Sequence, residues 1–262
     1  MWDGELSWRK LSVTGALILA LSLVATIAGA IIVPALADPL PGKANDAAST
    51  ANQPAETPSA TPSTQESASP TPSTTPRPFA DWARPLAAKL GIPQVALESY
   101  GYAEWVLQQT RPTCKLQWTT LAAIGKLAAD HGRLGSSALD AQGRQRPSRI
   151  GPALNGSGQP KVADTDAGAL DGDSTWDHAV GPMQMLPSMW RTSGVDADGD
   201  GLADPQDIDD AALAAGYFLC SGGKDLTVVA NWKAAVTGYH AMGPQIDKIF
   251  EIAQDYGVRS RA

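Results

Sequence analysis

The sequence predicts a mainly α-helical domain of the α+β class, with a small β or irregular part. Apolar residues between positions 79 and 256 recur mostly at helical spacing, which favours helices over strands. The stretch from Gly132 to Ala179 is rich in Gly, Pro and Asp and has few periodic apolar residues. Such a stretch predicts loops with a short β-hairpin, and a loop this long in a compact domain is usually functional.

An apolar segment precedes this domain. Residues 1–10 form a short N-terminus that ends in Arg9 and Lys10, and residues 11–37 contain no charge. This run is long enough to span a bilayer as a single transmembrane anchor, with residues 1–10 on the cytoplasmic side. Residues 35–37 also match an A-x-A cleavage site, so secretion after cleavage near Ala37 is the alternative. Both interpretations place the rest of the chain outside the cytoplasm, and the first places it at the cell membrane.

Residues 38–78 predict a disordered linker. Pro, Ser, Thr and Ala dominate this segment and aromatic residues are absent, so it cannot bury enough apolar surface to fold. A spacer of this kind can hold a domain away from the membrane surface, whereas a glycosylated stalk without a positioning role is the alternative. The folded domain then covers residues 79–262.

Helices are expected in order along this domain. Their predicted ranges are residues 82–90, 95–109, 117–130, 183–192, 207–219, 226–239 and 245–256. Pro93 is expected at the first position of the second helix, and Gly132 is expected to close the third. The helix over 207–219 begins with acidic residues, which suit a helix N-terminus.

Charge and cysteine content narrow the classes of function. The net charge is −7 and no basic patch is apparent, which argues against nucleic-acid binding. Cys114 and Cys220 are the only cysteines, and in an exported domain such a pair predicts a disulfide. A metal site at these cysteines would need histidines nearby, but His131, His178 and His240 are scattered singly.

An acidic loop follows the pattern of an EF-hand. Residues 196–207 read D-x-D-x-D-G with a carboxylate at the twelfth position, where an EF-hand loop has Glu. The expected ligands of a structural Ca²⁺ are Asp196, Asp198, Asp200, the Leu202 carbonyl, Asp204 directly or through water, and Asp207. The alternative is a solvated acidic turn in which Asp207 caps the next helix.

Two motifs carry a resemblance to a known family. Residues 121–133, LAAIGKLAADHGR, resemble the active-site helix of lytic murein transglycosylases, IG-[KR]-[VIL]-E-S-x-H-G-R, with Ala128 at the position of the catalytic glutamate. Residues 179–190, AVGPMQMLPSMW, resemble the AVGPMQFIPSTW motif of actinobacterial members related to membrane-bound lytic transglycosylase B. Further segments and the cysteine pair are similar in the same order, so the resemblance covers about residues 92–257.

The resemblance implies a lysozyme-like fold and peptidoglycan as the substrate. Members of this family cleave the MurNAc–GlcNAc bond and leave a 1,6-anhydroMurNAc end, without a cofactor for the chemistry. One glutamate protonates the leaving oxygen and then takes the proton of the C6 hydroxyl, for which its pKa must be raised. Gln184 matches a glutamine of the substrate cleft, and Tyr239 matches an active-site tyrosine that is followed here by His240 instead of Asn.

Ala128 leaves the catalytic residue unidentified. Asp130 is a weak substitute, because two residues along a helix correspond to about 200° of rotation, which points it to the opposite face unless the helix unwinds before Gly132. Further aspartates lie in the long loop, namely Asp164, Asp166, Asp171, Asp173 and Asp177.

Three interpretations remain open. One is a working lytic transglycosylase with another acid. The second is an inactive relative that binds peptidoglycan or a cell-wall assembly partner. The third is a calcium-stabilised domain without glycan affinity.

Overall fold

The computed structural model describes residues 78–239 and 243–262, and these residues confirm the mainly helical prediction. The predicted anchor over 11–37 lies outside the described residues, as do His240 and all of the predicted linker except Pro78. Within the described ranges, no helix has the length and apolar character needed to cross a membrane.

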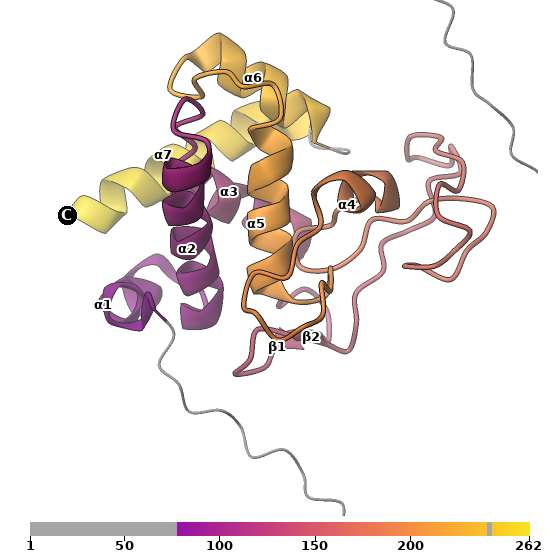
Figure 1. Ribbon diagram of the computed structural model, residues 1–262, viewed down its shortest axis with the longest axis horizontal. Helices are drawn as coiled ribbons and strands as arrows, with labels where there is room; N and C mark the ends of the chain where they lie inside the picture. The colour runs from indigo at the N-terminus through magenta and orange to yellow at the C-terminus, as the bar shows by residue number, and fades with distance from the viewer. Residues whose placement is uncertain (1–77, 240–242) are drawn as a thin grey trace, which may run out of the picture. The chain divides into compact units, whose positions relative to one another are not determined.

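The described chain forms helices joined by one long irregular segment that contains a small hairpin (Figure 1). In order, the elements are α1 (Ala80–Leu90), α2 (Gln94–Thr110), α3 (Trp118–Ala129), β1 (Ala138–Leu139), β2 (Gln145–Arg146), α4 (Pro187–Ser193), α5 (Ile208–Leu219), α6 (Val229–Gly238), the 3₁₀ turn η1 (Gly243–Gln245) and α7 (Ile246–Arg261). The irregular segment extends away from the helices on the side of α4 (Figure 1).

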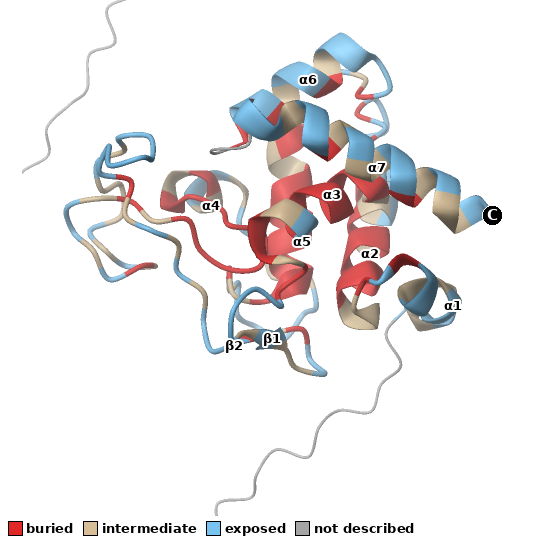
Figure 2. Cartoon of the chain, turned by 180° about the vertical axis from the view of Figure 1, so that it is seen from behind, coloured by how far each residue is buried: buried red, intermediate tan, exposed pale blue. Residues whose placement is uncertain are grey.

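The core is built around α5, which lies beside α2 (Figure 1). Most residues of α5 are buried, and Figure 2 colours most of this helix as buried. A Cβ at Gly216 of α5 would lie 2.6 Å from Leu107 Cδ1 of α2, so only glycine permits this approach. A buried hydrogen bond of 2.7 Å from Ser99 Oγ to Asp209 Oδ1 joins the two helices near their other ends.

The remaining helices enclose this pair. α3 packs mainly on α7, and α1 contacts both α2 and α7. The predicted disulfide is present: Cys114, just before α3, is joined to Cys220 at the end of α5, with their Cα atoms 5.5 Å apart. It closes a loop that contains α3, the irregular segment and α5.

Two predicted helix boundaries in the first half of the domain are wrong by short distances. Pro93 has φ −54° and ψ 136°, so it precedes α2 as the capping residue and is not the first helical residue. The third helix ends at Ala129, three residues before Gly132, because Asp130 already has φ 48°.

Later boundaries differ more. The predicted helix over 183–192 begins only at Pro187, because Gln184 has φ 49° and lies in a turn. The helix predicted over 226–239 begins at Val229, because the Leu226 amide bonds the Cys114 carbonyl at 2.8 Å. α7 continues to Arg261, beyond the predicted end at residue 256.

The expected hairpin in the long loop is present but short. β1 and β2 pair antiparallel with Leu139 opposite Gln145. Asp140 organises the turn, since its Oδ1 accepts the amides of Gln142 at 3.0 Å and Arg144 at 2.9 Å. The Gln145 amide also donates to the carbonyl of Gln206 at 2.8 Å, which ties the hairpin to the acidic loop.

Candidate functional site

Ala128 lies in the last turn of α3, where it is 7% exposed. The helix ends at Ala129 because the next three residues, Asp130, His131 and Gly132, have positive φ values of 48°, 56° and 84°. The His131 amide donates to the Gly125 carbonyl at 2.9 Å, a bond typical of a Schellman-type helix end. The helix therefore does unwind before Gly132, so Asp130 does not continue the helical face on which the sequence would place it.

Asp130 is held by two cations. Its carboxylate accepts a hydrogen bond from Lys126 and lies 3.4 Å from an Arg133 guanidinium nitrogen. Partial burial raises the pKa of Asp130, but the two cations outweigh this effect and leave the pKa below its usual value. A general acid needs a raised pKa, so this environment keeps Asp130 ionised instead.

His131 is fully buried between two tyrosines. Its Nδ1 lies 3.2 Å from the Tyr100 hydroxyl and its Nε2 lies 3.0 Å from the Tyr256 hydroxyl. Burial, followed by the charges of Arg133 and Lys126, lowers the pKa of His131 to about 3, so the ring is neutral. His131 thus fastens the end of α3 to α2 and α7 and does not face a ligand.

Gln184 lies in a tight turn before α4. Val180 and Met185 exchange backbone hydrogen bonds of 2.8 and 3.0 Å across this turn. The Gln184 side chain is 7% exposed and donates from Nε2 to the Gly181 carbonyl at 2.9 Å. A Cβ at Gly151 would lie 2.8 Å from Gln184 Oε1, so the glycine leaves room for the amide oxygen.

Tyr239 contacts the backbone of the same turn. It is fully buried, and its hydroxyl donates to the Met183 carbonyl at 2.9 Å. Burial raises the pKa of this phenol, so it is neutral. In this geometry Tyr239 positions the backbone beside Gln184 and does not present its hydroxyl to a ligand.

The turn lies against the face of α3 that carries Ala128. A Cβ at Gly125 would lie 3.4 Å from Met183 Sδ, and Ala128 is three residues along the helix from Gly125, hence on the same side. We call this region the Ala128 face and define it by Gly125, Ala128, Gly151 and Gln184, of which Gly151 is partly exposed and the others are buried. The structure thus brings together the two motifs that carry the family resemblance.

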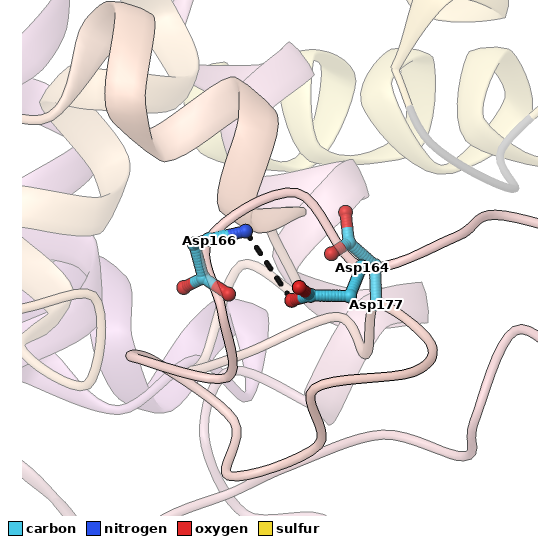
Figure 3. Close-up of side chains that lie close together, drawn as sticks. All are labelled: Asp164, Asp166 and Asp177. Atoms are coloured by element: carbon cyan, nitrogen blue, oxygen red, sulfur yellow. Dashed lines mark hydrogen bonds between the residues drawn. The ribbon is translucent and has the colours of Figure 1, made fainter.

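Three aspartates of the irregular segment, Asp164, Asp166 and Asp177, hold carboxylate oxygens within 4.8 Å of one another (Figure 3). Asp177 accepts hydrogen bonds from both the amide and the hydroxyl of Thr165 at 2.8 Å. Asp164 accepts the Asp166 amide at 3.2 Å, the bond drawn in Figure 3, and the Gly168 amide at 3.0 Å. Desolvation raises the pKa of Asp164, but the hydrogen bonds from these backbone amides lower it by more, so the net pKa is below its usual value. The Asp164 carboxylate therefore organises the loop in its ionised form.

The other two loop aspartates, Asp171 and Asp173, form hydrogen bonds with His178. Its amide donates to Asp171 Oδ2 at 2.7 Å, while its ring lies 3.2 Å from Asp173 and 2.7 Å from the Gly151 carbonyl. Desolvation lowers the pKa of His178, but the carbonyl and Asp173 raise it more, so the net shift is upward. These contacts connect the irregular segment to the Ala128 face through Gly151.

The acidic loop gathers some of the predicted calcium ligands but not others. Two groups of carboxylates have oxygens within 4.8 Å of one another: Asp196, Asp198 and Asp210 form one, and Asp198, Asp207 and Asp209 form the other. Two predicted carboxylate ligands lie outside both groups. Asp200 pairs with Arg144, and Asp204 Oδ1 accepts the Gln206 amide at 2.8 Å. Leu202, whose backbone carbonyl was the predicted ligand, is 57% exposed.

The sequence interpretation missed Asp209 and Asp210. Asp207 caps α5 by accepting the Asp209 amide at 2.9 Å, and Asp210 accepts the amides of Ala197 and Asp204. The signal was present, because both residues follow Asp207 in the first turn of a predicted helix. A twelve-residue motif ends before them, so matching the motif alone did not include them.

Crowding of these carboxylates has an electrostatic cost. Burial and then the charges of neighbouring aspartates raise the pKa of Asp207 to about 8 and that of Asp210 to about 6. Desolvation and neighbouring charges also raise the pKa of Asp198. Arg144 offsets part of this charge, since its Nε lies 3.8 Å from Asp207 Oδ2. Oxygen ligands in this number suit a hard cation such as Ca²⁺.

Comparisons with known proteins identify no relative of this chain. No family model, curated protein or solved structure matches it. The geometry of the Ala128 face and of the acidic loop therefore carries the functional argument, together with the motifs in the sequence.

Proposed function

We propose that the domain binds the glycan strands of peptidoglycan at the Ala128 face and does not cleave them by one-glutamate chemistry. The observation that carries this proposal is the methyl side chain of Ala128 at the position where the resembling family has its acid. Supporting it, the turn that holds Gln184 lies against the same side of α3. The proposal includes a lysozyme-like fold, for which the mainly helical architecture is the support.

The competing proposal is a working lytic transglycosylase that uses another acid. Such an acid must hold a proton near neutral pH until the leaving oxygen takes it. Cations lower the pKa of Asp130, and backbone amides lower that of Asp164. These environments favour ionised carboxylates, which supports binding over cleavage by these two residues.

We propose that the domain acts outside the cytoplasm, where peptidoglycan lies. Residues 11–37 would anchor it in the cell membrane, and residues 38–78 would let it reach glycan strands beyond the membrane surface. Secretion after cleavage near Ala37 is the alternative location. A cell-wall assembly protein is the alternative partner for the Ala128 face.

Replacing Ala128 provides the main test. We expect the full-length chain to sediment with purified sacculi and to release no anhydromuropeptides. If the face is otherwise intact, Ala128→Glu should release them at least about 100-fold faster than Ala128→Gln, because general acid catalysis contributes 10²–10⁴-fold. Ala128→Gln is the matched control, since it adds similar bulk without a proton to donate.

Two results would contradict the proposal. Release of anhydromuropeptides by the unmodified chain would establish the working enzyme, and the loop aspartates would then be tested singly. Failure of the unmodified chain to sediment with sacculi would favour a domain without glycan affinity.

We also propose that the acidic loop binds a structural Ca²⁺. The support is the grouping of Asp196, Asp198 and Asp210 and the raised pKa of Asp210, which a cation would relieve. Calcium should raise the melting temperature, and chelation should reverse the rise. Asp210→Asn should abolish the rise, whereas Asp255→Asn on α7 should leave it unchanged. A rise that persists in Asp210→Asn would favour the ligand set predicted from the sequence.

A further inference from the structure

A cavity of about 450 Å³ lies at the beginning of α3, at the other end of that helix from Ala128. Residues of α2, α3, α6 and α7 line it together with the loops before α3 and α6. None of the residues that define the Ala128 face is among them. Trp118 and Ala128 are ten residues apart, which corresponds to about 15 Å along the helix axis. The cavity is therefore separate from the surface proposed above.

Aromatic side chains on the cavity wall are held in fixed positions. The ring of Trp118 stacks on Tyr256, with centroids 6.5 Å apart and planes at 26°. Trp232 donates from Nε1 to Thr120 Oγ1 at 3.0 Å and meets Phe250 edge-on, with centroids 5.5 Å apart. These contacts cover part of each ring and fix its position, and fixed side chains reduce the entropy lost on binding.

The rest of the lining combines apolar residues, namely Leu226, Val229 and Ala253, with polar side chains, and it is close to neutral. Uncharged hydrogen-bonding side chains come from Gln117, Thr119, Thr120, Thr227, Gln254 and Ser260. The charged side chains largely balance, because Asp225 pairs with Lys115 at 2.7 Å and Glu104 opposes the charge of Arg261. A lining of this kind disfavours both a purely apolar ligand and a highly charged one. It suits a neutral ligand with many hydroxyl groups.

Glu104 is an acceptor in a fixed orientation. Its Oε2 accepts the Trp118 amide at 2.8 Å, and its Oε1 accepts the Gln108 side chain at 3.0 Å. Each carboxylate oxygen can accept a second hydrogen bond, so Glu104 can also accept from a hydroxyl in the cavity. Hydrogen bonds to an ionised acceptor are among the stronger ones.

We propose that this cavity binds a short neutral saccharide, with sugar rings against Trp118 and Phe250 and hydroxyls bonded to Glu104 and Gln254. The volume falls within the range of small-molecule sites, about 300–1,000 Å³. The lining of the cavity supports this proposal independently of the Ala128 face. If both surfaces bind glycan, the domain would engage two saccharides from the two ends of α3.

The test measures binding of an N-acetylglucosamine tetramer to the full-length chain by calorimetry and hydrogen–deuterium exchange. Bound tetramer should slow exchange in peptides that cover residues 117–120 and 250–261. Gln254 is exposed and lines the cavity, so Gln254→Trp should occupy part of the cavity without disturbing the core and weaken binding at least about tenfold. Val258→Trp is the matched control, because Val258 is on the same helix, 60% exposed and outside the lining.

A second variant, Glu104→Gln, tests the role of Glu104 as a hydrogen-bond acceptor for the saccharide. Glu104→Gln can still accept the Trp118 amide but loses the charge, so it should fold normally and bind the tetramer several-fold more weakly. Equal binding by Gln254→Trp and Val258→Trp would overturn the proposal. Absence of tetramer binding, or protection confined to residues 149–185, would do so as well.

The test also separates this proposal from the one for the Ala128 face. Ala128→Trp should weaken sedimentation with sacculi while the protection of residues 117–120 by the tetramer is kept. Loss of that protection in Ala128→Trp would show that the two surfaces are not independent and would overturn the cavity proposal. Retained cavity binding without any effect of Ala128→Trp on sacculi would overturn only the proposal for the Ala128 face.

Discussion

The helix pair α2 and α5 and the irregular segment between residues 132 and 207 are stabilised by different interactions. In the helix pair, side chains such as Leu97, Leu107 and Ile208 are fully or almost fully buried. The irregular segment is mostly exposed or partly exposed (Figure 2), and carboxylates such as Asp164 and Asp177 bond its backbone amides. One region depends on burial of apolar area, and the other on side-chain acceptors for the backbone.

The helix pair contributes mainly to the stability of the domain, whereas the irregular segment contributes residues to the proposed binding site. Burial of apolar surface makes a region cooperative with the whole domain, whereas exposed regions with few apolar contacts can open locally. The irregular segment supplies both Gly151 and Gln184, and its exposed parts can open without unfolding α5. The two regions should therefore respond independently to substitutions that affect only one of them.

Removal of the disulfide should have the largest effect, because it acts on both regions. The bond closes a loop with a sequence separation of 106 that contains the whole irregular segment. Cys114→Ala/Cys220→Ala should lower the free energy of unfolding by about 4–5 kcal/mol on the chain-entropy model. Urea unfolding measures this loss, and reduction of the unmodified chain should reproduce it. A loss below about 1 kcal/mol would mean that the unfolded chain gains little freedom when the bond is absent.

Matched apolar truncations compare the two regions directly. Leu97 is fully buried on α2, so Leu97→Ala should lower the free energy of unfolding by about 2–5 kcal/mol. Leu202 is 57% exposed in the acidic loop, so Leu202→Ala should change it by less than about 0.5 kcal/mol. Chemical denaturation of both variants is the measurement. Similar losses in the two would contradict the contrast between the regions.

The helical region was the more predictable of the two. Periodic apolar residues indicated α1 and α5 nearly in full, and Asp207 caps α5 as its composition predicts. The end of α3 was not predictable in this way, because His131, one of its three left-handed residues, is held by Tyr100 and Tyr256, which come from other helices. Contacts between residues far apart in the chain cannot be predicted from the local sequence.

The candidate site was predictable only where a motif covers it. The two motifs lie next to each other where Gly125 faces Met183, but they did not indicate that Tyr239 is buried beneath the turn. Asp210 was missed because it lies beyond the end of the calcium-loop pattern. The cavity beside Glu104 was missed because its walls come from segments that are far apart in the sequence.

Acid should weaken the helical region through His131. Its pKa is about 3 in the folded chain and about 6.5 when unfolded, so the unfolded state binds more protons between these values. Stability should therefore fall as the pH falls below 6.5, by about 2 kcal/mol between pH 7 and pH 5 from this residue alone. The raised pKa of Asp207 has the opposite sign, because the folded state then binds more protons.

A variant isolates the contribution of His131 from that of the carboxylates. His131→Gln should be less stable at pH 7, but it should lose about 2 kcal/mol less than the unmodified chain between pH 7 and pH 5. Urea unfolding at the two pH values gives both numbers. The same acid slope in both proteins would show that His131 does not titrate with a lowered pKa.

The smallest expected change is confined to the irregular segment. Asp177 is buried and accepts two hydrogen bonds from Thr165, one from its amide and one from its hydroxyl. Asp177→Asn replaces one acceptor oxygen with an amino group that cannot accept, so opening of this loop should become about 1–2 kcal/mol more favourable. Hydrogen–deuterium exchange should accelerate over residues 163–177 and stay unchanged over α5. Asp255→Asn on α7 is the control, because its ion pair with Arg259 is exposed and contributes little. Acceleration over α5 of the same size would show that the irregular segment and the helix pair unfold as one cooperative unit.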